Sequence, residues 1–219
     1  MIFDEKEAIR NLVHQLDSWW PENDINVVKR AVPIALANMN EIFSAKTLVN
    51  SDNEPKFSPY HSVQWAVFLY QVSHICALGG DIIEADKIYY LNKIMNGVDW
   101  YHKVKLPVHF FAEHPLGSVL GNASYGDYLF VYQGTTVGGN RHNYELKYPV
   151  LGSNVLMYAN STILGDCHIG NNVIVSAGAY LINETVPDNC LVFGRSPNLI
   201  IKNKSEAYIK EKTNHIWKW

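Results

Sequence analysis

The sequence predicts an α+β protein in which an N-terminal α-helical domain is followed by a parallel β-helix of hexapeptide repeats. Three observations lead to this prediction. Residues 1–97 carry apolar side chains at helical spacing, an aliphatic residue recurs at every sixth position from residue 119 onward, and residues 205–219 again have a helical pattern. We therefore divide the chain into a helical domain (1–97), a β-helix domain (98–202) and a C-terminal helical tail (203–219).

Four segments of the N-terminal domain have helical periodicity, and they are residues 5–20, 25–43, 62–78 and 82–95. The first segment ends at Pro21, the third at Gly79-Gly80 and the fourth at Asn96-Gly97, which are residue types typical of helix ends. Pro33 predicts a kink or a boundary inside the second segment, because proline lacks the N–H group that a helix interior needs.

The repeat of six residues predicts a triangular column. Its members, which we expect to point inward, are Val119, Tyr125, Val131 and Val137, then Leu151, Met157, Ile163, Ile169, Val175 and Leu181. A spacing of six fits neither the 3.6-residue period of an α-helix nor the two-residue period of a strand. It is typical of a parallel β-helix, in which three hexapeptides form one coil and stacked coils bury a continuous apolar core.

The repeat is interrupted once, between Val137 and Leu151, where fourteen residues separate positions that twelve would keep in register. We expect residues 138–148 to leave the column as a loop, and loops on a rigid scaffold often carry function. Later, Leu191–Arg195 followed by Ser196-Pro197 predicts a closing strand and a turn. Residues 205–219 are expected to form a helix that caps the open end, because an uncapped end exposes unpaired strand edges.

The composition narrows the class of protein. With 47% hydrophobic residues, 18% charged residues and a net charge of -3, the chain is not a disordered segment and has no strongly basic surface for nucleic acid or anionic lipid. No apolar segment is long enough to span a membrane, and residues 1–7 lack the features of a signal peptide. The three cysteines have no CxxC spacing and predict no disulfide framework. We expect a cytoplasmic protein with neither a nucleic-acid nor a membrane partner.

Several side chains that can do acid–base chemistry follow the helical domain within sixteen positions, namely Asp99, His102, His109, Glu113 and His114. The histidine spacing matches no HExxH or facial-triad pattern, so no metal site is predicted. A histidine whose second ring nitrogen is held by a carboxylate is a good general base near neutral pH. By this reasoning either Asp99 or Glu113 could orient a catalytic histidine.

Residues 98–200 resemble the serine O-acetyltransferases, a family of hexapeptide-repeat acyltransferases. The family pattern reads Val-Asp-Ile-His, Leu-Asp-His, Thr-Leu-Gly-Gly and Asp-Arg-His-Pro. This chain has Val98-Asp99-Trp100-Tyr101, Ala112-Glu113-His114, Thr136-Val137-Gly138-Gly139 and Asn140-Arg141-His142-Asn143 at the corresponding places. The interval of fifteen residues between the aspartate and the histidine is kept. The resemblance implies that the β-helix is left-handed.

The resemblance also implies an activity, the transfer of an acetyl group from acetyl-CoA to the hydroxyl of L-serine in cysteine biosynthesis. It implies that His114 is the general base, that Asp99 is its orienting partner and that His142 is a second catalytic histidine. Arg141 would bind the serine carboxylate. Glu113, which replaces an aspartate of the family, would contact the substrate amine.

The resemblance to the serine O-acetyltransferases also implies a co-substrate and an oligomeric assembly. The arm of acetyl-CoA would lie along the edge of the column between two subunits and contact Gly139, Ala159, Ala177, Arg195 and Lys202. The chain would assemble as a homo-trimer, or as a hexamer if the helical domains pair. The C-terminal residues 216–219 lack the Gly-Ile type of tail with which the family docks onto cysteine synthase, so this partner is not expected.

Two further functions stay open. The helical part is shorter than in the family, the loop before Arg141 is shorter, and Ser58-Pro59 is the nearest counterpart of an Asp-Pro segment that helps to bind serine. These departures are compatible with an O-acetyltransferase that acts on a sugar of a surface polysaccharide or its precursor. A non-catalytic trimeric scaffold is the third possibility, and the joint presence of Asp99, His114 and His142 argues against it.

Overall fold

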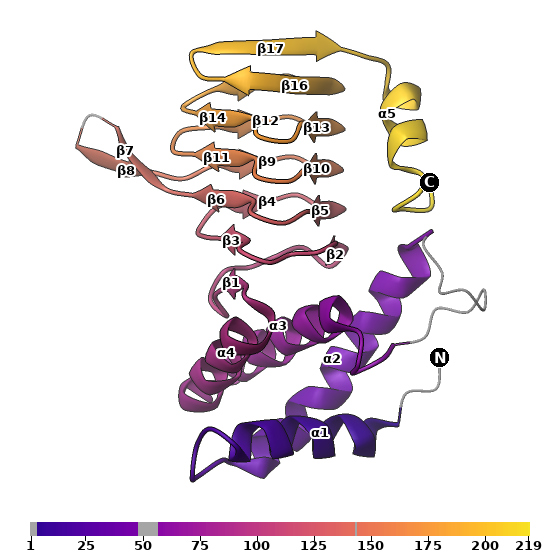
Figure 1. Cartoon of the computed structure of the whole chain (residues 1–219), viewed down its shortest axis with the longest axis vertical. Helices are drawn as coiled ribbons and strands as arrows, with labels where there is room; N and C mark the ends of the chain where they lie inside the picture. Colours follow the sequence, from indigo (N-terminus) through magenta and orange to yellow (C-terminus); the bar gives the residue numbers. More distant parts are fainter. Residues whose placement is uncertain (1–3, 48–56, 143) are drawn as a thin grey trace.

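The computed structural model describes residues 4–47, 57–142 and 144–219, and it confirms the predicted α+β architecture. Helices form the N-terminal part, and a column of short stacked strands rises from them (Figure 1). The change from helix to strand takes place between Asn96, the last residue of α4, and Asp99, the first residue of β1.

The four predicted helices are all present, as α1 (Glu5–Asp17), α2 (Ile25–Ala45), α3 (Ser62–Leu78) and α4 (Ile82–Asn96). Asp4 and Asp24 cap α1 and α2 by accepting hydrogen bonds from backbone N–H groups of the first turn. A kink or a boundary was predicted at Pro33, and the boundary is wrong, since α2 continues through this residue. The carbonyl that loses its helical partner belongs to Lys29, an exposed residue that water can reach, and the buried residues on either side of Pro33 hold the helix together.

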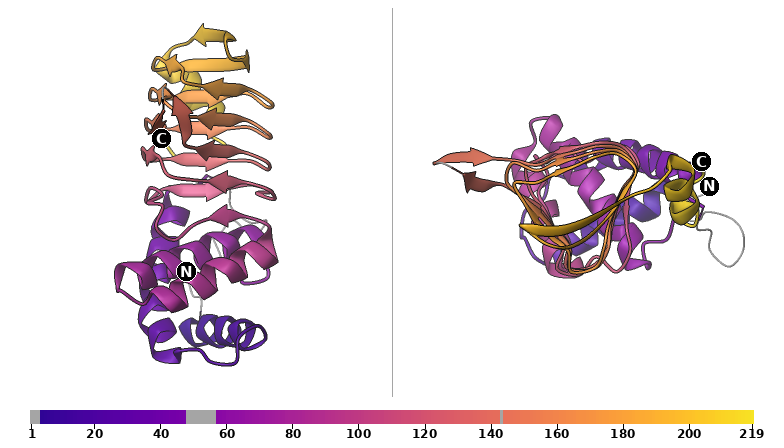
Figure 2. Two further views of the ribbon diagram at one scale, coloured as in Figure 1. Left: turned by 90° about the vertical axis from the view of Figure 1, so that its left-hand side faces the viewer. Right: turned by 90° about the horizontal axis from the view of Figure 1, so that it is seen from above.

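The column has three faces, each a stack of parallel strands (Figure 2). The first face contains β1 (Asp99–Trp100), β3 (Val119–Leu120), β6 (Thr136–Gly138), β11 (Thr162–Leu164) and β14 (Tyr180–Ile182). The second face contains β2 (Phe110–Ala112), β5 (Leu129–Val131), β10 (Val155–Met157) and β13 (Val173–Val175). The third face contains β4 (Ser124–Tyr125), β9 (Val150–Leu151), β12 (His168–Ile169) and β15 (Thr185–Val186). This arrangement is the predicted β-helix.

The inward column follows the predicted repeat with one exception. Val137, Ile163 and Leu181 are in register across neighbouring strands and have no exposed surface. Val119, which was expected to point inward, is 39% exposed, and its neighbour Leu120 is buried against Val137 instead. The connection from Leu120 to the next inward residue spans five positions, whereas later coils such as Ile163 to Ile169 span six. The period of six therefore does not extend back to β3.

Glycines allow the coils to approach closely at the corner that follows the third face. A Cβ atom on Gly126 would lie 2.4 Å from the carbonyl carbon of Gly152, and one on Gly152 would lie 2.7 Å from the carbonyl carbon of Gly170. The backbones of successive coils are therefore in direct contact at this corner, and a side chain in place of either glycine would push neighbouring coils apart.

The interruption of the repeat is a β-hairpin that projects from the column (Figures 1 and 2). Its antiparallel strands are β7 (Asn140–His142) and β8 (Glu145–Lys147). It leaves the column between β6 and β9, which is the corner between the first and third faces. The predicted excursion is thus confirmed, and it is more regular than a loop.

The C-terminal segment differs from the prediction. The upper end of the column is closed by a strand pair, β16 (Cys190–Arg195) and β17 (Asn198–Asn203), which run antiparallel. The helix α5 (Glu206–Thr213) lies beside the column and does not cap it (Figure 1). Because β17 already covers the edge of β16, the buried tail residues Ile209, Ile216 and Trp217 are free to pack elsewhere. None of the helices in the described ranges is both long and apolar enough to cross a membrane.

Candidate functional site

His114 lies in the turn between β2 and β3, at the corner between the second and first faces. Its φ of 48° is in the left-handed region, which is sparsely populated by residues with a Cβ atom. The turn is held by hydrogen bonds from the Glu113 N–H to the Val131 carbonyl (3.0 Å) and from the Gly117 N–H to the Gly97 carbonyl (2.8 Å). The backbone is thus anchored to both the column and the end of α4, while the imidazole is exposed.

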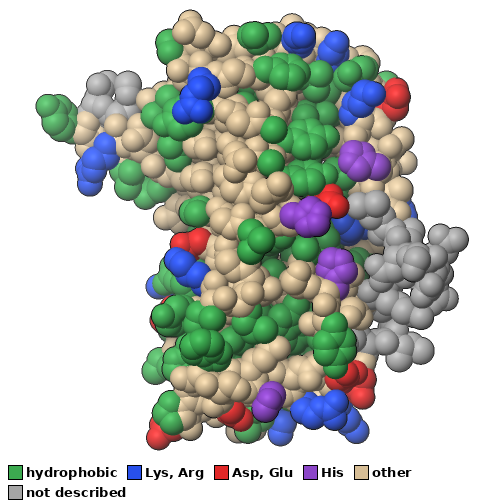
Figure 3. Space-filling model, in the orientation of Figure 1, with side chains coloured by type: hydrophobic (Ala, Val, Ile, Leu, Met, Phe, Trp, Pro, Cys, Tyr) green, Lys and Arg blue, Asp and Glu red, His purple; other side chains and the backbone are tan. Residues whose placement is uncertain are grey.

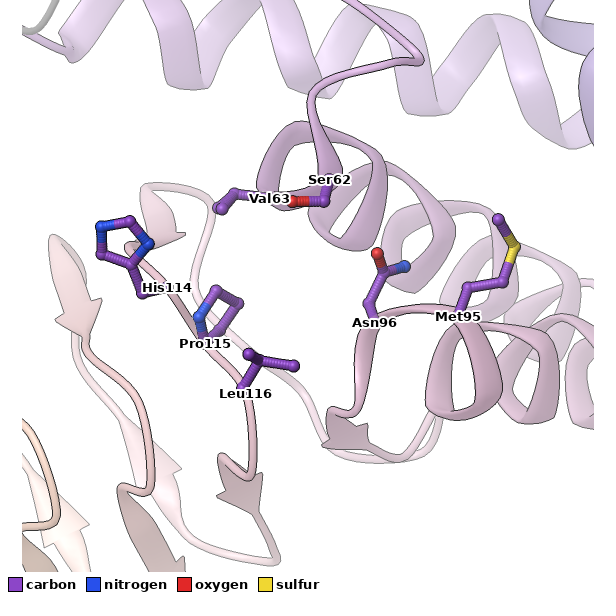
Figure 4. A pocket seen from close by; sticks show the side chains of 7 residues that line it. All are labelled: Ser62, Val63, Met95, Asn96, His114, Pro115 and Leu116. Atoms are coloured by element: carbon purple, nitrogen blue, oxygen red, sulfur yellow. The ribbon is translucent and has the colours of Figure 1, made fainter.

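A small cavity of about 150 Å³ adjoins His114 where the helices meet the column. Its walls come from the start of α3, the end of α4 and the turn itself, and its lining residues are Ser62, Val63, Met95, Asn96, His114, Pro115 and Leu116. Figure 4 shows the imidazole at one end of this group and Met95 at the other. The Asn96 amide donates a hydrogen bond to the Asn92 side chain (2.9 Å), which holds its orientation. His114 is therefore next to a space that can receive a small polar group.

Asp99 is bound by two side chains of α4. The Tyr89 hydroxyl donates to one carboxylate oxygen (2.6 Å) and the Lys93 ammonium to the other (2.6 Å). Partial burial acts to raise the pKa of Asp99, but the hydrogen bonds from Lys93 and Tyr89 outweigh it, and the pKa lies below its usual value. Within the described ranges no hydrogen bond joins Asp99 to His114, so their pairing stays a prediction. Tyr89 and Lys93 were missed, although their i, i+4 spacing near the end of α4 is a usable signal.

Glu113, the residue before His114, acts electrostatically on a different group of side chains. One of them is Tyr132, whose ring stacks on Tyr158 with centroids 5.2 Å apart. Burial, followed by the influence of Glu113, raises the pKa of the Tyr132 hydroxyl. The carboxylate also acts electrostatically on the ammonium of Lys46, the residue that follows α2. Sequence reasoning missed Lys46 because nothing in the local pattern connects it with this corner.

The hairpin carries the other two predicted side chains. Arg141 pairs with Leu146 across β7 and β8, and its side chain is exposed. His142 ends β7 and pairs with Glu145 through the backbone, and its side chain is outside the described structure. Figure 3 shows the hairpin standing clear of the rest of the surface. The chain places it at the corner between the first and third faces, whereas His114 is at the corner between the second and first faces.

The residues predicted to contact acetyl-CoA are also divided between corners. Ala159 and Ala177 lie one coil apart at the corner that carries His114, and the Gly178 N–H donates to the Ala159 carbonyl (2.9 Å). Gly139 lies at the base of the hairpin, where a Cβ atom would come within 2.7 Å of the Tyr148 ring.

The two predicted phosphate partners are exposed cations at the end of the column. The guanidinium of Arg195 lies 4.7 Å from the Tyr180 ring centroid, and the ammonium of Lys202 lies 5.4 Å from that of Phe193. Among the side chains that the structure describes, no three His, Cys, Asp or Glu residues are grouped as a metal site would need.

Comparison with known proteins agrees with this architecture. Residues 148–183 match the family described as bacterial transferase hexapeptide (six repeats). A serine acetyltransferase of Synechococcus elongatus is 33% identical over 115 residues, which is 52% of this chain and 47% of that protein. A serine acetyltransferase of Staphylococcus epidermidis is 30% identical over 140 residues, which is 64% of this chain and 65% of that protein. The chain thus spans about half to two thirds of the length of these relatives.

Solved structures show the same fold. The serine acetyltransferase of Brucella abortus superposes with a TM-score of 0.71 at 18% identity, covering 92% of this chain and 84% of that one. The same enzyme in complex with coenzyme A gives a TM-score of 0.69 at 16% identity, covering 94% and 84%. The Neisseria gonorrhoeae serine acetyltransferase in complex with serine gives 0.66 at 22% identity, covering 86% and 81%. The resemblance to serine acetyltransferases found in the sequence is confirmed.

Proposed function

We propose that this chain is an acetyl-CoA-dependent O-acetyltransferase whose acceptor is the hydroxyl group of L-serine. The observation that carries the proposal is the exposed His114 imidazole on an anchored turn, at the corner where the small residues Ala159 and Ala177 leave the column edge open. The likeness to serine acetyltransferases solved with serine and with coenzyme A supports the choice of both substrates.

The reaction follows from the chemistry of these groups. The imidazole of His114 takes the proton of the acceptor hydroxyl, and the oxygen attacks the carbonyl carbon of the thioester. The tetrahedral intermediate then breaks its carbon–sulfur bond, and the thiolate of coenzyme A takes the proton back from the imidazolium. Asp99, held by Tyr89 and Lys93, provides a negative charge two residues after Gly97, to which the turn of His114 is anchored.

Assembly completes the proposed site. Because the hairpin and His114 occupy different corners of the column, Arg141 and His142 of one subunit would reach the His114 corner of its neighbour. We therefore propose a trimer with three shared sites. Sedimentation equilibrium is expected to give a mass that is a multiple of three chains, and a stable monomer with full activity would contradict shared sites.

The acceptor is tested by measuring the release of the coenzyme A thiol with L-serine and with a panel of sugars. Release with L-serine supports the proposal. A sugar hydroxyl is the second candidate, and one observation favours it. Glu113 stands where the resemblance places an aspartate that contacts the substrate amine, and its extra methylene moves the carboxylate away from that contact. Release with sugars alone would replace L-serine by this second candidate.

Replacing Arg141 with alanine is expected to raise the KM for L-serine by about 10- to 100-fold, since a charge-assisted bidentate contact to the carboxylate is lost. The KM for a neutral sugar should stay the same. Lys147→Ala is the matched control, because Lys147 is a cation of the same hairpin that already pairs with Glu145 (2.8 Å). An equal effect of Arg141→Ala on both acceptors would remove the role of Arg141 in binding a carboxylate.

A further inference from the structure

Two tyrosines that the proposed reaction does not use lie above the residue that precedes His114. The position after the last residue of β2, β5 and β10 is occupied by Glu113, Tyr132 and Tyr158, respectively. These three strands lie one above another (Figure 1), and the backbone N–H groups of the three residues donate to carbonyl groups of the next coil (3.0, 3.0 and 2.9 Å). Because the last residue of each strand is buried in the column, the side chains that follow point outward.

The rings of Tyr132 and Tyr158 are stacked, with centroids 5.2 Å apart and an angle of 20° between their planes. We call these two rings the tyrosine stack. The Tyr132 ring also packs edge-on against the buried Phe130 (5.4 Å), whose ring contacts Trp217 of the C-terminal tail (6.2 Å). Packing thus fixes one side of the tyrosine stack, while both side chains are only half-buried and keep part of their surface accessible.

The tyrosine stack borders the corner that carries His114. Tyr158 is followed directly by Ala159, one of the small residues of the column edge. The turn of His114 has six residues between β2 and β3, whereas the turns of the next two coils have four. The exposed imidazole therefore belongs to a longer turn in the first coil, and the two rings occupy the second and third coils beside the same edge.

We propose that the tyrosine stack is a binding surface for the pantetheine arm of acetyl-CoA. This inference rests on the proposed function, in which the thioester lies beside His114 and the arm follows the column edge past Ala159 and Ala177. An arm on this course passes the second and third coils, and these are the coils that carry Tyr132 and Tyr158. The methylene and methyl groups of the arm pack on the rings, and the phenol hydroxyls stay available to its amide groups.

The fixed position of the rings favours binding. Side chains that are already held by Phe130 and by each other lose little conformational freedom when a ligand packs on them. The apolar groups of the arm leave water at the same time, which adds to the affinity. Removing one ring is therefore expected to weaken the binding of the arm and to leave the binding of the nucleotide part unchanged.

The experiment titrates the full-length wild type and Tyr158→Ala with coenzyme A and with adenosine 3′,5′-bisphosphate, which lacks the arm, in a calorimeter. The Kd for coenzyme A is expected to rise about tenfold, and the Kd for the bisphosphate should stay the same. An equal rise for both ligands would place the contact on the nucleotide. An unchanged or lower Kd for coenzyme A would show that the ring does not hold the arm, and either result would overturn the proposal.

Two further variants serve as controls. Tyr158→Phe keeps the ring and should bind coenzyme A within about threefold of the wild type, so a loss as large as that of Tyr158→Ala would contradict packing on the ring. Tyr90→Ala removes another partly exposed tyrosine, which packs on Trp20 of the helical domain (6.0 Å). Its Kd for coenzyme A should equal that of the wild type. A rise as large as that of Tyr158→Ala would show a general effect of losing a tyrosine and would also overturn the proposal.

Kinetics separate this inference from the proposed function. In Tyr158→Ala the KM for acetyl-CoA should rise about tenfold while the KM for the acceptor stays the same. A rise in the acceptor KM alone would assign the tyrosine stack to the acceptor and overturn the inference. A wild-type protein that binds coenzyme A and transfers no acetyl group to any acceptor would overturn the proposed function, and a higher Kd of Tyr158→Ala for coenzyme A would still support the contact with the arm.

Discussion

His114→Ala is expected to lower kcat by about 10²–10⁴, with the affinity for acetyl-CoA retained. The loss corresponds to the removal of general-base catalysis, because no other imidazole is among the residues that line the cavity at this corner. Binding of coenzyme A is expected to persist since the column edge near Ala159 and Ala177 is unchanged. Steady-state kinetics with acetyl-CoA and L-serine, together with calorimetric titration of coenzyme A, measure the two effects separately.

His114→Asn is the control for this prediction. The φ of 48° at this position is unfavourable for alanine, whereas asparagine adopts the left-handed region more readily. Asparagine keeps the turn but cannot act as a base, so its kcat should be as low as that of the alanine variant. Turnover near the wild-type value in either variant would place the base elsewhere.

Trp217→Ala is expected to lower the free energy of unfolding by about 3–5 kcal/mol, as for other buried large-to-small changes. The side chain is 1% exposed, and its ring packs edge-on against Tyr128 (5.6 Å) and Phe130 (6.2 Å) as well as covering Lys46. For a protein of this size the loss corresponds to a fall in Tm of roughly 6–20 °C. Calorimetry and denaturant titration measure it.

Trp19→Ala provides the comparison, because Trp19 is 56% exposed and follows the end of α1. Its removal should change stability by no more than about 0.5 kcal/mol. If both tryptophan variants lose the same stability, the tail does not hold the helices against the column in the way the structure shows.

The parts of the fold that repeat locally could be predicted from the sequence. Val137, Ile163 and Leu181 form the inner column as the period of six predicted, and α3 begins and ends at the predicted residues. In a regular element the buried side chains recur at a fixed spacing, which can be seen in the sequence. The same reasoning found the excursion at residues 138–148 because an insertion breaks the period. It went wrong at Val119, where a shorter turn changes the period itself.

The candidate site was predicted only in part. The roles of His114 and Arg141 come from motif resemblance and stay predictions, and the partners of Asp99 could not be predicted. Asp99 is bonded to Tyr89 and Lys93 of α4.

By itself the sequence determined the order of helix and column, the inner residues of the coils and the place where the chain leaves them. The tertiary structure alone decided that α5 lies beside the column, that Trp217 reaches the end of α2 and that Lys46 is enclosed by the rings of Phe111, Phe130 and Trp217. The physical reason is that the burial of a repeating element depends on neighbours a few residues away. A contact between segments far apart in the chain depends on how all the intervening elements pack, and no local pattern records that packing.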